Sequence, residues 1–341
     1  MLKTAVIGLG MGLNFHIPQI VSHKKFELAA IADVDEEKLR IASEKYNVPG
    51  YTDAYEMMDT VPLDLVVIAS PTQFHAPHSI AAMERGIDVF LEKPMASTLE
   101  EAKEIYDVHI RTGRKIMVYQ PHRTFSETVA AKAILDSGIL GRVYRITRSI
   151  RTYFKRSSWQ AYKKNGGGTL NNHGSHYIDL LLYLAKGNAV SVKCELQRIL
   201  ATGDADDCAR ILMKTDNDIV LDIDMNFASA FNPNVWELYG DLGTAVLVHP
   251  ESGKPFFRAR YLDLKFALEA QKYYPCTNPL NDNAEYPWMI KDFEVGDNRY
   301  AINIYDKCYE YFKLNQEPFV PITDTLKVMD VLKRCHADSM F

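Results

Sequence analysis

Residues 3–119 alternate short apolar runs with amphipathic stretches. The apolar runs lie at 4–7, 28–32, 65–69, 87–91 and 116–119. Because they are apolar at consecutive positions, we expect strands of a parallel sheet that is covered on both faces. Helix-capping residues, Asp35 and the pair Ser97-Thr98 among them, begin the stretches between the runs. This alternation predicts a doubly wound α/β domain.

The pattern changes after about Pro121. A helix is predicted over 127–135, ending at Gly138, and a long strand over 143–153. The next helix, over 169–185, should start behind three consecutive glycines and close at Gly187. Extended segments joined by Gly, Asn and Asp turns follow near 189–200, 207–214, 218–227, 234–240 and 243–249. They predict a mostly antiparallel sheet.

The last part of the chain is less regular. Residues 264–300 are rich in Tyr, Pro and Asn with weak periodicity, so we interpret them as a long functional or interface loop. Helical patterns near 300–313 and 323–338 follow. We therefore expect two domains, residues 1–121 and residues 122–341, and the length of 341 residues agrees with that number.

Composition narrows the function classes. Hydrophobic residues make up 47% and charged residues 24% of the chain, which excludes disordered, collagen-like and coiled-coil proteins. The formal net charge of −5 gives no basic footprint for nucleic acid, and no apolar run is long enough for a membrane helix. The five cysteines are an odd number without C-x-x-C spacing, which favours a reducing compartment, the cytoplasm, and no structural zinc.

A glycine-rich turn follows the first predicted strand. Its sequence is Gly8-Leu9-Gly10-Met11-Gly12-Leu13, so the third glycine of a G-x-G-x-x-G motif is displaced by one position. Such a turn brings backbone N–H groups and a helix N-terminus to a pyrophosphate. Asp33 ends the second strand, where its carboxylate can accept both ribose hydroxyls and would repel a 2′-phosphate. The unit predicts binding of NAD rather than NADP, and the alternative is that Asp33 merely caps a helix.

Two further segments carry candidate chemistry. Glu92-Lys93-Pro94 ends the fifth predicted strand, at the sheet edge where doubly wound folds bind ligands; the alternative is a solvated Lys93 paired with Glu92. In the helix over 169–185, Asn172, His176 and Asp179 are spaced i, i+4 and i+7 and should share one face. A lone histidine there would usually be a satisfied core residue, but the glycine cluster before it favours a site.

These segments together resemble the glucose-fructose oxidoreductase / inositol dehydrogenase / MocA (Gfo/Idh/MocA) family over essentially the whole chain. The similarity rests on the glycine turn followed by His16, on Glu92-Lys93-Pro94, and on the segment from Gly166 to Asp179. The resemblance implies an N-terminal Rossmann domain and a C-terminal α/β domain with a large open sheet, with a nicotinamide held between them. It also implies oxidation of a sugar or polyol hydroxyl, or the reverse reduction.

The resemblance also implies roles for individual residues. Lys93 would hydrogen-bond the reacting oxygen and His176 would act as general acid/base. Asn172 stands where dehydrogenases of this family commonly carry Asp; an Asn can fix the tautomer of His176 or bind a substrate hydroxyl, but it cannot stabilise an imidazolium by charge. The expected cofactor contacts are Gly8, Gly10, Met11, Gly12, Leu13, Asp33, Ser70, Pro71, Thr72, His75, Glu92 and Lys93.

Some predictions concern the substrate and the assembly. His75 and His78 lack a third ligand nearby, so we expect no metal site and place His75 near the nicotinamide edge. Arg123, Tyr153 and Trp159 offer stacking and donors for a sugar or an anionic sugar derivative, although they could equally be rim or interface residues. A sheet with one apolar face must be covered, which predicts a homodimer or homotetramer.

Three functions remain open from the sequence. The first is an NAD-dependent dehydrogenase acting on a sugar, cyclic polyol or sugar derivative. The second is a non-catalytic NAD-binding sensor or scaffold, which the Asn at position 172 favours, whereas Lys93 and His176 favour the enzyme. The third is an enzyme that uses bound NAD transiently for elimination or epimerisation. The sugar, the carbon that reacts and the physiological direction are not specified.

Overall fold

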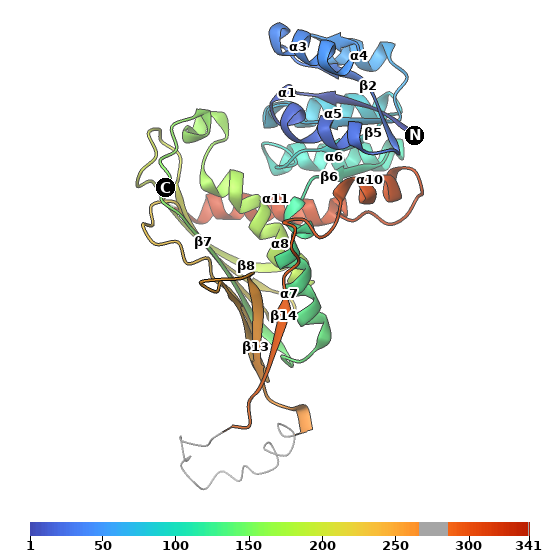
Figure 1. The fold of residues 1–341 in the computed structure, drawn as a ribbon. Helices are drawn as coiled ribbons and strands as arrows, with labels where there is room; N and C mark the ends of the chain where they lie inside the picture. Colours follow the sequence, from blue (N-terminus) through green and yellow to red (C-terminus); the bar gives the residue numbers. More distant parts are fainter. Residues whose placement is uncertain (266–285, 340) are drawn as a thin grey trace. The chain divides into compact units, whose positions relative to one another are not determined.

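The computed structural model describes residues 1–265, 286–339 and 341, and they form two compact units (Figure 1). Unit 1 consists of Met1–Pro121 and Asn303–Lys333, and unit 2 consists of His122–Ile302 and Arg334–Phe341. The first break falls where the sequence analysis placed a domain boundary. The second corrects that analysis, because residues 303–333 had been assigned to the second domain and belong to unit 1.

Unit 1 is built on a six-stranded sheet of order β3-β2-β1-β4-β5-β6 whose neighbouring strands all pair in parallel. This confirms the predicted doubly wound Rossmann sheet. The strands are β1 (Leu2–Ile7), β2 (Phe26–Ala32), β3 (Gly50–Tyr51), β4 (Leu65–Ile68), β5 (Asp88–Leu91) and β6 (Ile116–Val118). Every residue of β4 is buried, as expected for a strand covered on both faces.

Helices connect these strands, and the two caps expected from the sequence are present. They are α1 (Leu9–Met11), the π-helical turn η1 (Gly12–His16), α2 (Ile17–Ser22), α3 (Glu36–Tyr46), α4 (Ala54–Thr60), the 3-10 turn η2 (Thr72–Phe74), α5 (His75–Glu84) and α6 (Leu99–Thr112). Asp35 accepts from the Lys38 N–H at the start of α3. Thr98 and Glu101 form a capping box at the start of α6.

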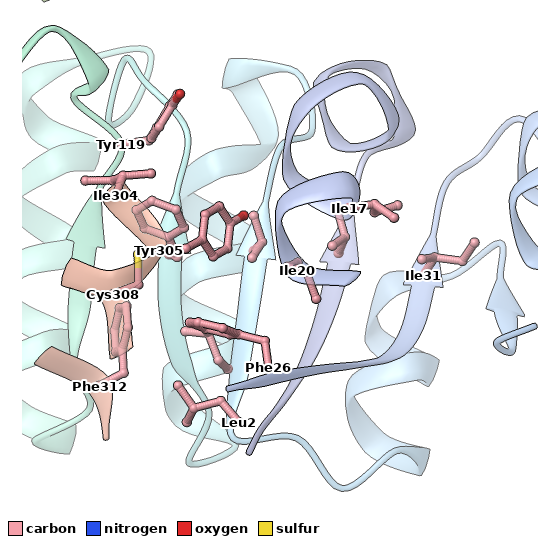
Figure 2. Close-up of a cluster of buried hydrophobic side chains, with 14 of the residues drawn as sticks. Leu2, Ile17, Ile20, Phe26, Ile31, Tyr119, Ile304, Tyr305, Cys308 and Phe312 are labelled. Carbon is pink, nitrogen blue, oxygen red and sulfur yellow. The ribbon is translucent and has the colours of Figure 1, made fainter. Parts of the chain in front are cut away.

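The C-terminal segment joins unit 1 through α10 (Ile304–Phe312), drawn in red beside the blue-to-cyan strands in Figure 1. Its buried face presents Tyr305, Cys308 and Phe312, and Figure 2 shows these side chains among apolar residues of the sheet that include Phe26. The rings of Phe26 and Tyr305 lie 5.4 Å apart. This burial explains why residues 303–333 belong to unit 1. The last helix, α11 (Ile322–Asp338), runs from this segment into residues assigned to unit 2.

Unit 2 contains an eight-stranded sheet of order β14-β13-β12-β11-β7-β10-β9-β8. All pairs are antiparallel except β7 with β10, which confirms the mostly antiparallel prediction. The strands are β7 (Val143–Arg151), β8 (Ala189–Gln197), β9 (Cys208–Thr215), β10 (Val220–Asn226), β11 (Trp236–Gly240), β12 (Gly243–Val248), β13 (Phe256–Tyr261) and β14 (Met289–Glu294).

Two strands of this sheet were not expected. β13 was missed, and β14 lies inside residues 264–300, which the sequence analysis interpreted as a loop. None of the six residues of β14 is buried, so its sequence lacks the alternation that marks a half-covered strand. Residues 266–285 of the expected loop lie outside the described residues.

One face of the eight-stranded sheet is covered by helices. α7 (Ser126–Ser137) packs against β13 and β14, and α8 (Ser175–Ala185) packs against β7 and β10. α7 ends at Gly138 as expected, whereas α8 ends at Lys186 in a left-handed conformation rather than at Gly187. Short helical turns precede α7 and α8: η3 (Pro121–Thr124), η4 (Trp159–Ala161), η5 (Lys163–Asn165) and the π-helical η6 (Leu170–Gly174).

The other face of this sheet is charged. Arg145 pairs with Asp222 at 2.6 Å and Arg151 with Asp224 at 2.8 Å, on positions that alternate with the buried Ile223. The expectation of an apolar open face was therefore wrong, although the large antiparallel sheet itself is present. In the described part of the chain, no helix is both long and apolar enough to cross a membrane.

Candidate active site

The glycine turn of unit 1 is fixed by close backbone packing. Gly8 has a φ of 92°, and a Cβ there would lie 2.5 Å from the backbone of Ala69 and Ser70. A Cβ on Gly12 would lie 2.9 Å from Val6 of β1, so Gly12 provides the close helix–strand contact that the third glycine of the motif normally allows. Leu13 packs instead against the hydrophobic core. The displaced glycine begins a π-helical turn, and the close contact of Gly12 with β1 is kept.

Asp33 is tied to this turn. Its Oδ2 accepts from the Leu9 N–H at 2.6 Å and its Oδ1 accepts from the Asp35 N–H at 2.9 Å. The cap of α3 is Asp35, so Asp33 does not serve as the helix cap considered in the sequence analysis. A carboxylate has about four acceptor positions, and the two backbone bonds leave Asp33 capacity for hydroxyl groups.

The Glu92-Lys93 turn follows β5 and rests on a buried chain of hydrogen bonds. Glu92 is 5% exposed; its Oε1 is 3.0 Å from Nε2 of His16, and its Oε2 accepts from the Lys93 N–H at 3.0 Å. Nδ1 of His16 is 2.8 Å from the Tyr305 hydroxyl. The side chain of Glu92 therefore fixes the backbone of Lys93. Glu92 is buried, so the two residues do not form the solvated pair of the alternative interpretation.

Protonation in this chain follows from burial. Burial raises the pKa of Tyr305 well above its ordinary value, so its hydroxyl keeps its proton beside Nδ1 of His16. Because the Glu92 carboxylate can only accept, Nε2 of His16 carries a proton and donates to it. Burial alone would raise the pKa of Glu92, but the hydrogen bond from His16 and the charges of His16 and Lys93 lower it overall. Glu92 is thus held as a carboxylate.

The buried side chain of His75 contacts the backbone of the Ser70 loop and of the Lys93 turn. It is 1% exposed, with Nδ1 2.8 Å from the Pro94 carbonyl oxygen and Nε2 2.9 Å from the Ser70 carbonyl oxygen. Both ring nitrogens therefore contact backbone carbonyl oxygens, and the position of His75 near the nicotinamide edge stays a prediction. Ser70 and Thr72 are half-buried, and Pro71 is exposed. The contacts of Gly8 and His75 bring the glycine turn, the Ser70 loop and the Lys93 turn together at the carboxyl ends of β1, β4 and β5.

In unit 2, His176 lies at the start of α8. The residues before it form the π-helical turn η6, so the expected single α-helix from 169 is interrupted. His176 is 8% exposed, and its ring stacks on that of His122 with centroids 4.3 Å apart and planes 13° apart. The sequence analysis missed His122, because nothing local to residue 122 indicates contact with a residue so far along the chain.

Arg123 and Asp179 form a buried ion pair. Arg123 donates from Nε to Oδ2 of Asp179 at 2.8 Å and from Nη2 to Oδ1 at 2.6 Å, and the two side chains are 2% and 0% exposed. The guanidinium also lies 4.6 Å from the ring centroid of Tyr183. Asp179 thus takes the planar fork of Arg123 inside the protein, and the substrate contact expected for Arg123 stays a prediction.

The other predicted substrate residues are at the surface. Tyr153 is 63% and Trp159 is 57% exposed. Between them in sequence lies Arg156, which the sequence analysis did not select and which is only 7% exposed. Arg156 donates to Oε1 of Gln160, and Oε1 of Gln160 also lies 3.4 Å from Nδ2 of Asn172. Asn172 thus belongs to a polar group that reaches Arg156.

No group of His, Cys, Asp and Glu side chains suited to hold a metal ion occurs within residues 1–265, 286–339 and 341. Each unit by itself brings polar groups together. Unit 1 has backbone donors at a glycine turn beside a carboxylate and a lysine, which are suited to binding hydroxyl groups and an anion. Unit 2 has a histidine, an asparagine and a buried guanidinium, which are suited to moving a proton and to binding polar groups.

Comparison with known proteins gives matches along most of the chain. Residues 2–120 match a family model described as an oxidoreductase family with an NAD-binding Rossmann fold, and residues 128–246 match the GFO/IDH/MocA C-terminal domain. A crystal structure of an NAD-binding protein from Listeria innocua has a TM-score of 0.81 at 21% identity, covering 99% of this chain and 94% of that chain. This likeness shows a shared fold.

Two curated relatives illustrate the range of similarity. A 1-carboxy-3-chloro-3,4-dihydroxycyclohexa-1,5-diene dehydrogenase from Comamonas testosteroni is 29% identical, over 68% of this chain and 59% of its own length. An inositol 2-dehydrogenase 2 from Saccharopolyspora erythraea is 26% identical over 84% of both chains. The chain thus matches less than two thirds of the first of these relatives and most of the second.

Proposed function

The chain belongs to the Gfo/Idh/MocA oxidoreductase family, and we propose that it transfers hydride between NAD and a hydroxyl or carbonyl group of a sugar, cyclic polyol or sugar derivative. The observation that carries this proposal is the turn at Lys93. A buried carboxylate, Glu92, holds its backbone at the same sheet edge as the glycine turn. Named relatives that act on inositol and on a dihydroxylated ring support the substrate class.

The residues of unit 1 fit NAD. A side chain at Gly8 would clash with the Ala69–Ser70 backbone, whereas the space around Gly10 is open, so the turn leaves room for a pyrophosphate near its N–H groups. Asp33 retains acceptor capacity for the two ribose hydroxyls, and its charge opposes a 2′-phosphate. When bound, the nicotinamide supplies a hydride acceptor or donor.

We assign the proton chemistry to Lys93 and His176. The Lys93 ammonium donates to the reacting oxygen and stabilises negative charge that develops there as hydride leaves carbon. His176 takes the hydroxyl proton during oxidation and returns it during reduction. Asn172 is proposed to bind a substrate hydroxyl or orient His176, without adding charge.

We also propose that the protein is a cytoplasmic homodimer or homotetramer. The cysteines at 194, 208, 308 and 335 are free thiols, in keeping with a reducing compartment. Assembly through the eight-stranded sheet would be polar in character, since that face carries the Arg145–Asp222 and Arg151–Asp224 pairs.

A substrate panel tests the proposed function. Polyols, aldoses and sugar acids are offered with NAD and with NADP, and reduction is followed by nicotinamide absorbance. We expect NAD reduction with at least one member. Two single variants test the proton chemistry: Lys93→Met, which keeps much of the side-chain stem, and His176→Ala. Each should lower turnover about 10²–10⁴-fold while NAD affinity is retained. No reduction with any member would favour a sensor, and product formation without net reduction would favour transient use of bound NAD.

A further inference from the structure

Arg156 is a buried cation to which the described residues offer no ion pair. Within the part of the chain that the structure describes, its hydrogen bonds run from Nη1 to Oε1 of Gln160 and from Nη2 to Nε2 of His173, the latter at 3.2 Å. Its Nε is buried and has no hydrogen-bond partner. The guanidinium lies 5.9 Å from the ring centroid of Phe154 and 6.0 Å from that of Phe227. Two aromatic rings and two neutral acceptors therefore hold a permanent charge.

Three other arginines of unit 2 each have a carboxylate partner. Arg123 is paired with Asp179, Arg148 with Glu127, and Arg151 with Asp224. Since a guanidinium stays protonated in proteins, a buried one without a carboxylate is costly. Such a side chain is kept where a charged partner arrives from outside or where its packing is indispensable, and these two cases can be separated by experiment.

The carboxylates whose charges act on Arg156 hydrogen-bond backbone instead. Asp206 and Asp207 act on it by charge and raise its pKa, whereas burial, the larger effect, lowers it. Oδ2 of Asp206 accepts from the Leu170 N–H, and both oxygens of Asp207 accept from backbone N–H groups of residues 199–201. These acids therefore organise backbone and leave the fork of Arg156 unmatched.

Arg156 lies beside the segment that carries the proposed reaction. His173 follows Asn172 in η6, and Gln160 links Arg156 to Asn172. An arginine can only donate, so Nε2 of His173 must accept and the ring of His173 is neutral, with its proton on Nδ1. His173 thus offers no negative charge to Arg156. The exposed rings of Tyr153 and Trp159 come from the same stretch of chain.

We propose that Arg156 recognises an anionic group of the substrate, a carboxylate or a phosphate, so that the protein acts on acidic sugars or polyols in preference to neutral ones. The inference rests on the proposed function and specifies its substrate class. A planar guanidinium donates two parallel hydrogen bonds to an oxyanion, which matches the geometry of a carboxylate or phosphate.

The test compares sugars that differ only in charge. The NAD-loaded protein is titrated by calorimetry with glucose, glucuronate and glucose 6-phosphate, so that carboxylate and phosphate are distinguished. We expect one of the two acids to bind about 10–100-fold more tightly than glucose, because charge-assisted hydrogen bonds to the guanidinium increase affinity by about that factor. Arg156→Met should abolish this difference, Arg156→Lys should retain part of it, and the exposed Arg142→Met, a matched control, should leave it unchanged.

A stability measurement separates recognition from packing. Arg156→Met removes a buried charge that has no ion pair, so its melting temperature should be equal to or above that of the wild type. A large fall would assign Arg156 a structural role and overturn the proposal. So would equal affinity of the wild type for glucose and both acids, or an acid preference that survives Arg156→Met.

Turnover of the same sugars distinguishes the two proposals. Oxidation of neutral and acidic sugars with equal kcat/KM and equal affinity would overturn the role of Arg156 and leave the proposed function intact. Absence of NAD reduction with every sugar would overturn the proposed function, while the binding titrations would still decide whether Arg156 recognises an anion.

Discussion

Unit 1 and unit 2 stabilise their buried charges in different ways. In unit 1, the Glu92 carboxylate receives hydrogen bonds from His16 and from the Lys93 backbone, and Tyr305 orients His16. In unit 2, the Asp179 carboxylate meets the fork of Arg123 directly. The first arrangement uses a titratable partner and ends at a proposed catalytic residue, whereas the second pairs two full charges inside the fold. We infer that the first positions a reactive group and the second holds helix α8 in place.

The largest effect is expected from breaking the pair in unit 2. Arg123→Met should lower the free energy of unfolding by about 3–5 kcal/mol, because it removes the guanidinium that pairs with the buried carboxylate of Asp179. Urea unfolding followed by circular dichroism measures this. The double variant Arg123→Met/Asp179→Leu should recover most of the loss, and a single-variant loss under about 1 kcal/mol would show that the pair does not carry the stability assigned to it.

A smaller and pH-dependent effect is expected from Glu92→Gln. At neutral pH the amide can accept from only one of its two neighbours and places its NH2 donor against either the Lys93 N–H or the Nε2 proton of His16, which should cost about 1–3 kcal/mol of stability. The lowered pKa of Glu92 means that its contribution is present above its ordinary value of 4.5 and is lost as pH falls from there. The stability difference between wild type and variant should therefore shrink in acid.

The control for this variant is Glu84→Gln, which changes an exposed acid paired with Arg111. It should alter stability by less than about 0.5 kcal/mol, with no acid dependence of the kind seen at Glu92. A stability difference for Glu92→Gln that stays constant between neutral and acidic pH would mean that Glu92 is not held as a carboxylate. The same variant should also lower kcat through the displaced Lys93 backbone.

The smallest effect concerns cofactor choice. Asp33→Ala should weaken NAD about tenfold or more, because hydrogen bonds to the ribose are lost, and it should reduce discrimination against NADP. Asp35→Ala, which removes the cap of α3, is the matched control and should leave NAD affinity unchanged. Fluorescence titration with both cofactors measures this. Equal wild-type affinity for NAD and NADP would contradict the role of Asp33.

Local sequence patterns predicted the regular elements well. The consecutive apolar strands of unit 1 and the caps at Asp35 and Thr98 are visible in short windows, and the structure confirms them. β14 was missed because none of its residues is buried, so no hydrophobic alternation marks it. The displacement of Gly12 is visible in the sequence, but its close contact with Val6 is a property of the folded chain.

The candidate site was predicted only where its residues form motifs. His16 and Tyr305 are 289 positions apart, and Arg123 and Asp179 are 56 apart, so these partners could not be paired from sequence alone. For that reason Arg123 was assigned to the substrate and Arg156 was overlooked. Both arginines are buried, but among the described residues only Arg123 has a carboxylate partner, and this difference is visible only in the folded chain.

Hydride transfer from a sugar carbon to NAD can be followed with a substrate from the panel that carries deuterium at the reacting carbon, with mass spectrometry of the nicotinamide after turnover. We expect reduced cofactor that carries one deuterium from the sugar. Reduced cofactor without deuterium, deuterium that returns to a rearranged sugar with no net reduction, or no transfer at all would contradict the proposed hydride transfer.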